Sequence, residues 1–186
     1  MKEKKVEIGS TREYSMSKQR WSEMDLESLM DLLANKDAVI RQKARQSLVA
    51  LGKPAVTSLN WTLRNSELDH VRWEAAKTLG AIGDIRAIPS LVRALEDSDS
   101  DVTWLAAEAL RKFGKIAWPV LLSALIKSGP DSVLLRQGAH HVFRNQKEDR
   151  FTDLLETLRK ALESSAAPEL TPSAASDILK RLKVKS

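Results

Sequence analysis

The sequence predicts an all-α fold, a right-handed α-solenoid in which about four helical hairpins stack in a row, with capping helices at the ends. Two observations predict it. Apolar residues recur at helical spacing in pairs of segments separated by a glycine or a short turn, and the pattern returns after 31 residues. A period of about 20–50 residues is typical of solenoids, because each unit is too small to bury its apolar face without its neighbours.

The clearest copy of the repeat is 71–95, with the sequence VRWEAAKTLGAIGDIRAIPSLVRAL. Its first half places four apolar side chains on one face of a helix, at Val71, Ala75, Leu79 and Ile82. Gly83 supplies the left-handed conformation that ends a helix, Asp84 can cap the next one, and Pro89 fits a first helical turn. The second half carries its own apolar stripe, at Ile88, Leu91 and Leu95.

The same template fits three more times along the chain. A shift of 31 residues in each direction gives two close copies of the first helix, at Ile40, Ala44, Leu48, Leu51 and Gly52 and at Val102, Ala106, Leu110, Phe113 and Gly114. A looser fourth copy runs through Leu135, Ala139 and Phe143, with a second helix carrying Phe151, Leu154 and Leu158. Asn145 stands near its missing glycine and can also adopt the left-handed conformation.

This copy number predicts the organisation of the chain. We expect a flexible N-terminal arm at 1–22 and a repeat domain at 23–163, in which 23–35 forms an N-terminal cap. Within that domain we expect the repeats at 38–66, 69–97, 101–128 and 132–163. A linker at 164–171 then leads to a C-terminal helix and tail at 172–186, which either folds back over the last repeat or docks elsewhere.

The repeat resembles the short HEAT repeat, in particular the variant named after phycobilisome lyases. That family pairs a helix of the form D-x-x-V-R-x-x-A-A-x-x-L-G-x-I-G with a helix of the form A-V-P-x-L. Here the match is carried by Val71-Arg72, Ala75-Ala76, Leu79-Gly80, Ile82-Gly83 and Ala87-Ile88-Pro89-Ser90-Leu91, and it covers about residues 24 to 163. The resemblance implies the fold and says little about function, because sites are grafted onto folds.

Composition limits the class of protein. The chain has 186 residues, 42% of them hydrophobic, and no cysteine, which excludes disulfides and cysteine-ligated zinc. The first residues, MKEKKVEIGS, lack the apolar core of a secretory signal, and no run approaches the about 18 apolar residues of a membrane span. We therefore expect a cytoplasmic monomer that does not enter membranes.

The net charge of +5 is concentrated at the ends of the chain. Residues 1–22 carry +3 and residues 164–186 carry +2, whereas residues 23–163 hold 20 basic and 20 acidic side chains. Nucleic-acid binding favours a clustered basic stripe, so a neutral repeat domain makes DNA or RNA an unlikely partner.

The candidate binding residues follow from one repeat position on the second helices. Trp61 aligns there with Asp31, Arg93, Ser123 and Glu156, and because the other members are polar, this position faces solvent. In HEAT proteins the second helices line a concave surface, so the resemblance implies a protein-binding face there. Trp61 either packs against Arg64 or Arg93 or anchors a partner, since Trp and Arg are enriched at binding hot spots. The predicted set is Asp31, Trp61, Arg64, Arg93, Lys127 and Glu156.

The remaining tryptophans favour structural roles. Trp73 and Trp104 are 31 residues apart, so we expect them to stack on adjacent first helices, with binding of a flat ligand as the alternative. Trp118 aligns with core positions and is interpreted as core. Arg41, Arg72 and Arg136 share one repeat position, and aspartates just before these helices, at Asp37, Asp69, Asp101 and Asp131, suggest a ladder of ion pairs or caps between repeats.

Catalytic chemistry has no support in the sequence. His140 and His141 are adjacent and point about 100° apart on a helix, so they cannot chelate one ion together. The His-Glu dipeptides through which the HEAT-like deoxyhypusine hydroxylases bind iron are absent. HEAT-like DNA glycosylases use tryptophans and a carboxylate in a basic groove; Trp61 with Asp31 or Glu156 could be fitted to that scheme, but the neutral body argues against it. We expect no catalytic residues, cofactor or metal.

The sequence therefore favours a non-catalytic scaffold that binds a protein partner through the concave face. Two alternatives stay open. One is a phycobilisome-lyase-like factor acting on a bilin-protein, suggested by the resemblance alone. The other is a nucleic-acid-binding protein that uses its basic tails, which would bind in a strongly salt-dependent way.

Overall fold

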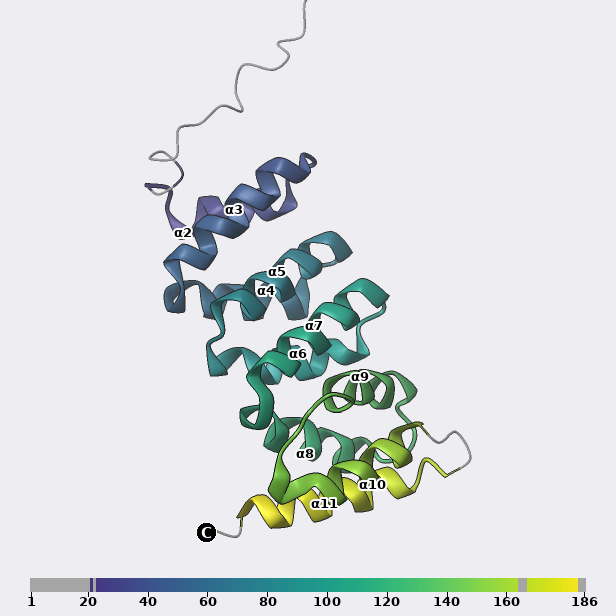
Figure 1. Ribbon diagram of the computed structural model, residues 1–186. Helices are drawn as coiled ribbons and strands as arrows, with labels where there is room; N and C mark the ends of the chain where they lie inside the picture. Colours follow the sequence, from purple (N-terminus) through teal and green to yellow (C-terminus); the bar gives the residue numbers. More distant parts are fainter. Residues whose placement is uncertain (1–20, 22, 164–166, 184–186) are drawn as a thin grey trace, which may run out of the picture.

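The computed structural model describes residue 21 and residues 23–163 and 167–183. These residues form helices joined by short turns, and no β-strand occurs among them. The helices stack side by side in chain order (Figure 1), which confirms the predicted all-α solenoid. Apart from Trp21, the arm expected at 1–22 lies outside the described residues, as do 164–166 of the expected linker and the end of the tail, 184–186.

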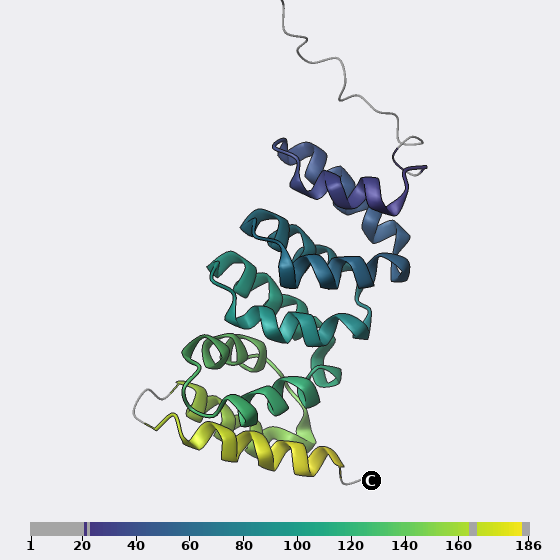
Figure 2. The ribbon, with the colours of Figure 1, turned by 180° about the vertical axis from the view of Figure 1, so that it is seen from behind.

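The helices of the repeats form two layers, which Figures 1 and 2 show from opposite sides. The first layer contains α3 (Ala38–Leu51), α5 (Asp69–Ile82), α7 (Ser100–Phe113) and α9 (Val133–Phe143). The second layer contains α2 (Leu26–Asp31), α4 (Val56–Asn65), α6 (Ile88–Arg93) and α8 (Trp118–Ser128). Short 3-10 turns extend or precede the second-layer helices, at Leu32–Ala34, Lys53–Ala55, Ile85–Ala87, Ala94–Glu96 and Gly114–Ile116. Consecutive helices of each repeat therefore alternate between the two layers.

The helix ends follow local sequence signals. Gly83 has φ 70° and ψ 23°, a left-handed conformation that a side chain disfavours, and its N–H donates to the Leu79 carbonyl at 3.0 Å. The Asp84 carboxylate then accepts from the Arg86 N–H at 2.9 Å and starts the next turn, and Pro89 lies in the first turn of α6. The helix stop, the cap and the proline position predicted from the sequence are confirmed.

The seams between neighbouring repeats are built from small and branched apolar side chains. Val71, Leu79, Leu91 and Leu95 are all buried, with exposed fractions of at most 6%. Near the C-terminal ends of α5 and α7, Gly80 allows the two helices a close approach, because a Cβ atom built on it would lie 2.8 Å from the Cβ of Ala109. Such close seams bury each repeat against the next.

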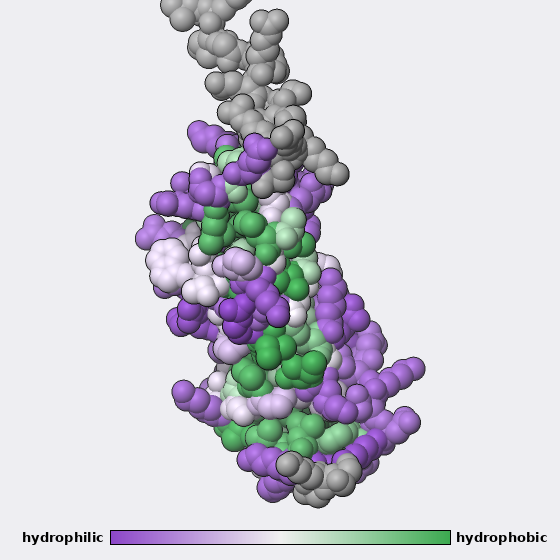
Figure 3. Space-filling model, turned by 90° about the vertical axis from the view of Figure 1, so that its left-hand side faces the viewer, coloured by the Kyte–Doolittle hydropathy of each residue, from purple (hydrophilic) through white to green (hydrophobic). Residues whose placement is uncertain are grey.

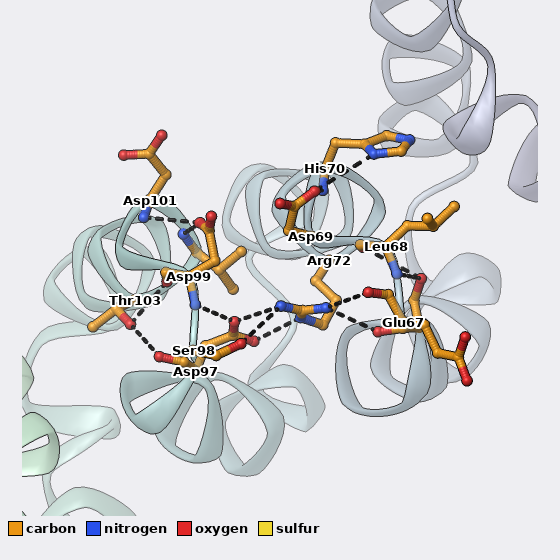
Figure 4. A network of polar contacts seen from close by, with 12 residues as sticks. Glu67, Leu68, Asp69, His70, Arg72, Asp97, Ser98, Asp99, Asp101 and Thr103 are labelled. Carbon is orange, nitrogen blue, oxygen red and sulfur yellow. Dashed lines mark hydrogen bonds and ion pairs between the residues drawn. The ribbon is translucent and has the colours of Figure 1, made fainter.

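Arg72 joins two turns between repeats (Figure 4). Its guanidinium binds both oxygens of Asp97 at 2.8 Å, and it donates to the backbone carbonyls of Ser66 at 3.0 Å and Glu67 at 3.2 Å. Both side chains of this ion pair are largely shielded, with exposed fractions of 12% and 9%. Hydrogen bonding to Asp97 raises the pKa of Arg72 further. The arginine thus fastens the turn before its own helix to the turn before α7.

The observed ladder differs from the expected one in its acidic members. Arg41 repeats the carbonyl contacts of Arg72, donating to Asn35 and Lys36, but its ionic partner is Glu74, at 3.4 Å. Asp69 and Asp101 lie inside the first turns of α5 and α7 and do not pair with the arginines. The carboxylates that pair with these arginines come from the following repeat: Glu74 lies on α5, and Asp97 lies in the turn before α7. Aligning the starts of the first helices did not indicate either of them.

The C-terminal end departs from simple stacking. After α10 (Thr152–Glu163), the last helix, α11 (Leu170–Lys183), packs extensively against α8, while α10 packs against α9 and α11. In Figure 2 α11 lies directly below α8, so it continues the second layer. The C-terminal helix therefore folds back on the repeats, as the first of the two expectations had it, and begins two residues earlier than predicted.

Trp118 forms the centre of this end of the core. Its side chain is fully buried, and its ring lies 5.7 Å from those of both Phe143 and Phe151. The core position read from the sequence is thus confirmed. Phe151 is buried in the 3-10 turn Asp149–Phe151 that precedes α10, and Leu155 and Leu158 are buried on α10 itself. The predicted Leu154 is only partly buried against this core.

Trp21 differs from the flexible arm to which the sequence assigned it. Its side chain is 7% exposed and belongs to the core cluster, with the Lys43 amine 5.9 Å from its ring centre.

Within the described ranges, every helix is too short or too polar to span a lipid bilayer.

Candidate functional site

The second-layer helices present one row of exposed side chains. On α4 the exposed residues are Thr57, Trp61, Arg64 and Asn65, and the first three alternate with the buried Leu59 and Leu63. Equivalent positions are exposed on the neighbouring helices. We call this row the second-helix surface, and it comprises Glu27, Asp31, Thr57, Trp61, Arg64, Pro89, Arg93, Glu96, Pro119, Ser123 and Lys127.

The larger hollow on this surface lies between α2 and α4, and we call it the Trp61 groove. It has a volume of about 980 Å³. Leu26 and Met30 contribute apolar wall from α2, and Trp61 contributes its indole from α4. The charged residues among its lining are two acids, Glu27 and Asp31. The groove is therefore apolar at its walls and negative at its α2 side.

Trp61 is 62% exposed, an unusual state for so large an apolar side chain. The sequence offered packing against Arg64 or Arg93 as one explanation. Within the described part of the chain, neither guanidinium lies over the Trp61 ring, and the Arg64 Nε–H instead donates to the Asn60 carbonyl at 3.1 Å. The indole face is thus available to a ligand.

A second, smaller hollow of about 250 Å³ lies between α4 and α6, and we call it the arginine hollow. Arg64 and Arg93 line it, together with the Arg72–Asp97 ion pair. Ser66 lines both this hollow and the Trp61 groove, so the two are neighbours on one surface. Chemically, the pair offers an apolar slot flanked by carboxylates on one side and guanidinium groups on the other.

The structure thus brings together four of the six residues predicted from the sequence. Asp31 and Trp61 share the groove, and Arg64 and Arg93 share the arginine hollow. Lys127 is exposed on α8 and lines neither hollow. Glu156 lies on α10 and pairs with Lys160 at 2.8 Å, which lowers the pKa of its carboxyl group.

Leu26 and Met30 are groove residues that sequence reasoning missed. In the N-terminal cap predicted at 23–35, Leu26 lies at helical spacing with Leu29 and Leu33, which predicts one apolar stripe, but only Leu29 and Leu33 are buried. A residue at the edge of a stripe carries the same periodic signal whether it is covered or lines a hollow. The signal that could have found the groove is the combination of this edge leucine with an exposed tryptophan one repeat later.

The outer side of the first layer carries a different hollow, of about 480 Å³, lined by Trp73 and Trp104. The two rings do not stack as expected. The Lys77 amine lies 4.2 Å from the ring centre of Trp73, whereas Trp104 meets the His141 ring edge-on at 6.2 Å. Both tryptophans already have partners within the chain, which favours a packing role.

Glu108 beside this hollow is held by two cationic or polar neighbours. The Arg111 guanidinium binds both of its oxygens, at 2.8 and 3.2 Å, and a ring nitrogen of His141 lies 2.6 Å away. These hydrogen bonds, of which the one from Arg111 has the largest effect, lower the pKa of Glu108 to about 2.

Among the residues that the structure describes, no three His, Asp or Glu side chains gather into a group that could hold a metal ion.

Comparison with known proteins identifies the repeats. Residues 56–143, from α4 through α9, match the family model of HEAT repeats. No curated protein matches the chain. The match names HEAT repeats as a whole, and the phycobilisome-lyase variant stays a prediction. The stacked helical hairpins, glycine helix stops and arginine-bridged turns agree with this match, so residues 56–143 of the chain are HEAT repeats.

Proposed function

We propose that the protein is a non-catalytic scaffold that binds a protein partner through the second-helix surface. HEAT repeats generally mediate protein–protein interaction. Their stacked helices make an extended surface whose exposed side chains can vary without disturbing the core. Exposed apolar and guanidinium groups, which this surface presents at Trp61, Arg64 and Arg93, are features of binding surfaces.

The single observation that carries the proposal is the 62% exposure of Trp61 at the edge of an apolar groove of about 980 Å³. With about 200 Å² for a tryptophan side chain and about 25 cal/mol per Å², covering the exposed part contributes about 3 kcal/mol. That contribution is in the range of a binding hot spot. A partner that inserts an apolar side chain beside the indole would gain it.

The surface is also preorganised. The α4 helix that bears Trp61 is fixed from behind by the buried Leu59 and Leu63 and packs along α5. A side chain presented from a packed helix loses little further freedom on binding, so less of the contact energy is lost to ordering.

The test begins with partners captured from the cell of origin by the full chain, after which each is purified and its affinity is measured. We expect Trp61→Ala to weaken binding by about 30-fold, equivalent to about 2 kcal/mol, and Arg93→Ala to weaken it less. Trp104→Ala is the matched control, because Trp104 is 54% exposed on the first layer. Unchanged affinity in both Trp61→Ala and Arg93→Ala would rule out this surface.

A further inference from the structure

We propose that the ligand of this surface is a bipolar peptide segment. An apolar side chain of the segment fills the Trp61 groove, a Lys or Arg lies on its α2 side, and an Asp or Glu lies on its α6 side. This inference rests on the proposed function and adds the chemistry of the partner. It is carried by the order of charges along the second-helix surface.

The α2 side of the surface is negative. Glu27 and Asp31 are exposed and line the groove, and among the described residues neither carboxylate has a hydrogen-bond or ion-pair partner. Lys and Arg side chains do not line the groove within the described ranges. A cationic side chain of a ligand would therefore find two carboxylates whose charges are not already compensated nearby.

The α6 side of the surface carries a net positive charge, because three arginines and only two acids line the arginine hollow. Asp97 is bound by Arg72, and Glu96 accepts a hydrogen bond from the Ser132 hydroxyl. Arg93 has no hydrogen-bond or ion-pair partner among the described residues, and Arg64 uses its Nε–H alone, on a backbone carbonyl. Their remaining N–H groups can bind a ligand carboxylate, which guanidinium groups recognise in a bidentate manner.

Geometry sets the length of the segment. Packed helices lie about 8–10 Å apart, and the groove holds α2 at least that far from α4, so the distance from α2 across α4 to α6 is at least about 20 Å. An extended chain advances about 3.3 Å per residue, and at least about six residues are therefore needed to cover that distance. The expected pattern has a basic residue at one end, an apolar anchor near the middle and an acidic residue at the other end. Exposed charges mainly set specificity, so each matched charge should improve affinity by about 3–10-fold at low salt.

The experiment selects binders to the full chain from a phage-displayed library of random 12-residue peptides. Enriched peptides are synthesised and their affinities are measured by fluorescence anisotropy. We expect an apolar residue flanked by Lys or Arg on one side and Asp or Glu on the other, and at least about a 10-fold loss of affinity with Trp61→Ala. Circular dichroism of each variant verifies that it is folded.

Two charge-reversed variants test the order of charges. Selection against the double variant Glu27→Lys, Asp31→Lys should enrich peptides that are acidic at both ends. Selection against Arg64→Glu, Arg93→Glu should enrich peptides that are basic at both ends. The double variant Asp69→Lys, Asp101→Lys is the matched control for the acidic side, since it makes the same charge change at two exposed positions of the first layer and should leave the bipolar pattern unchanged.

The outcomes separate the inference from the function on which it rests. Peptides that depend on Trp61 but show no charge pattern, or keep one pattern in all variants, would overturn the bipolar ligand and leave the binding surface in place. Peptides that bind Trp61→Ala as well as the unmodified chain, or a selection that enriches none, would overturn both.

Discussion

Replacing Gly80 with alanine tests the packing that holds the repeats in register. Gly80 lies in the last turn of α5, and replacing a glycine with an alanine at a free position in a helix stabilises it by at most about 1 kcal/mol. At this position, however, the new Cβ would lie 2.8 Å from the Cβ and 3.4 Å from the Cα of Ala109 on α7. Carbon atoms pack best at about 3.5–4.0 Å, so the two helices would have to separate by nearly 1 Å.

The expected net effect is destabilising. Overpacking of a close-packed core typically costs about 1–3 kcal/mol, and the gain in helix propensity offsets at most about 1 kcal/mol of it. The methyl groups of two alanines are fixed to their helices and cannot turn aside as a long flexible side chain can, which places the cost towards the upper end. We therefore expect Gly80→Ala to lower the free energy of unfolding by about 1–2 kcal/mol.

Urea unfolding of a double-mutant cycle measures this effect and isolates its cause. Ala109→Gly alone should also be destabilising, because it opens a gap and lowers helix propensity. The combination of Gly80→Ala with Ala109→Gly moves the methyl group from one helix to the other, so we expect a favourable coupling of about 1–2 kcal/mol between the two changes. Stabilisation by Gly80→Ala alone, or strictly additive effects, would refute the close approach of α5 and α7.

Three further predictions concern other contacts. Arg72→Ala should cost about 2–3 kcal/mol in urea unfolding, because it removes charge-assisted bonds to a shielded Asp97, and Arg72→Lys should recover little since it lacks the bidentate geometry. Trp118→Ala should cost about 3–5 kcal/mol, whereas Trp118→Phe should cost clearly less; equal losses would contradict a packing role. The pKa of Glu108 in the folded state is about 2, below its ordinary value of 4.5. The ionised carboxylate therefore stabilises the folded state fully above pH 4.5, and this stabilisation is lost as the pH falls towards 2. The difference in Tm between the unmodified chain and Glu108→Gln should shrink over that interval, and a difference independent of pH would contradict the assignment.

The repeat seams could be predicted from the sequence because apolar residues at helical spacing mark the face of a helix that is buried. Val71, Leu79, Leu91 and Leu95 recur at helical spacing, and all four are buried. The glycine at 83 ends its helix for a reason local to one residue, the low cost of a left-handed backbone without a side chain. Buried faces and helix ends, which depend on residues within one repeat, could therefore be predicted from the sequence.

The binding surface could be predicted only in part. That Trp61 faces solvent followed from its polar equivalents, and the structure places it with Asp31 in one groove. The groove itself depends on the distance between the short α2 and α4. The periodic spacing of apolar residues does not predict that distance. For this reason Leu26 and Met30 were not expected in the lining.

The C-terminal end shows a second limit. Both α10 and α11 are amphipathic, and a sequence pattern does not say which of them packs along α8. In the structure α11 takes that place, with Ala174, Ala175 and Ile178 buried. Its small side chains permit a close approach to α8. As a result Glu156, which is on α10, does not belong to the second layer that carries the second-helix surface.

Site-specific photo-crosslinking tests most directly the claim that the second-helix surface is where a partner binds. A benzophenone amino acid would be placed at Thr57, which lines the Trp61 groove, at Arg93 in the arginine hollow, and at the exposed Asp101 of the first layer as a control. With a captured and purified partner, the account predicts crosslinks from positions 57 and 93 and none from position 101. Crosslinks from position 101 alone would contradict it.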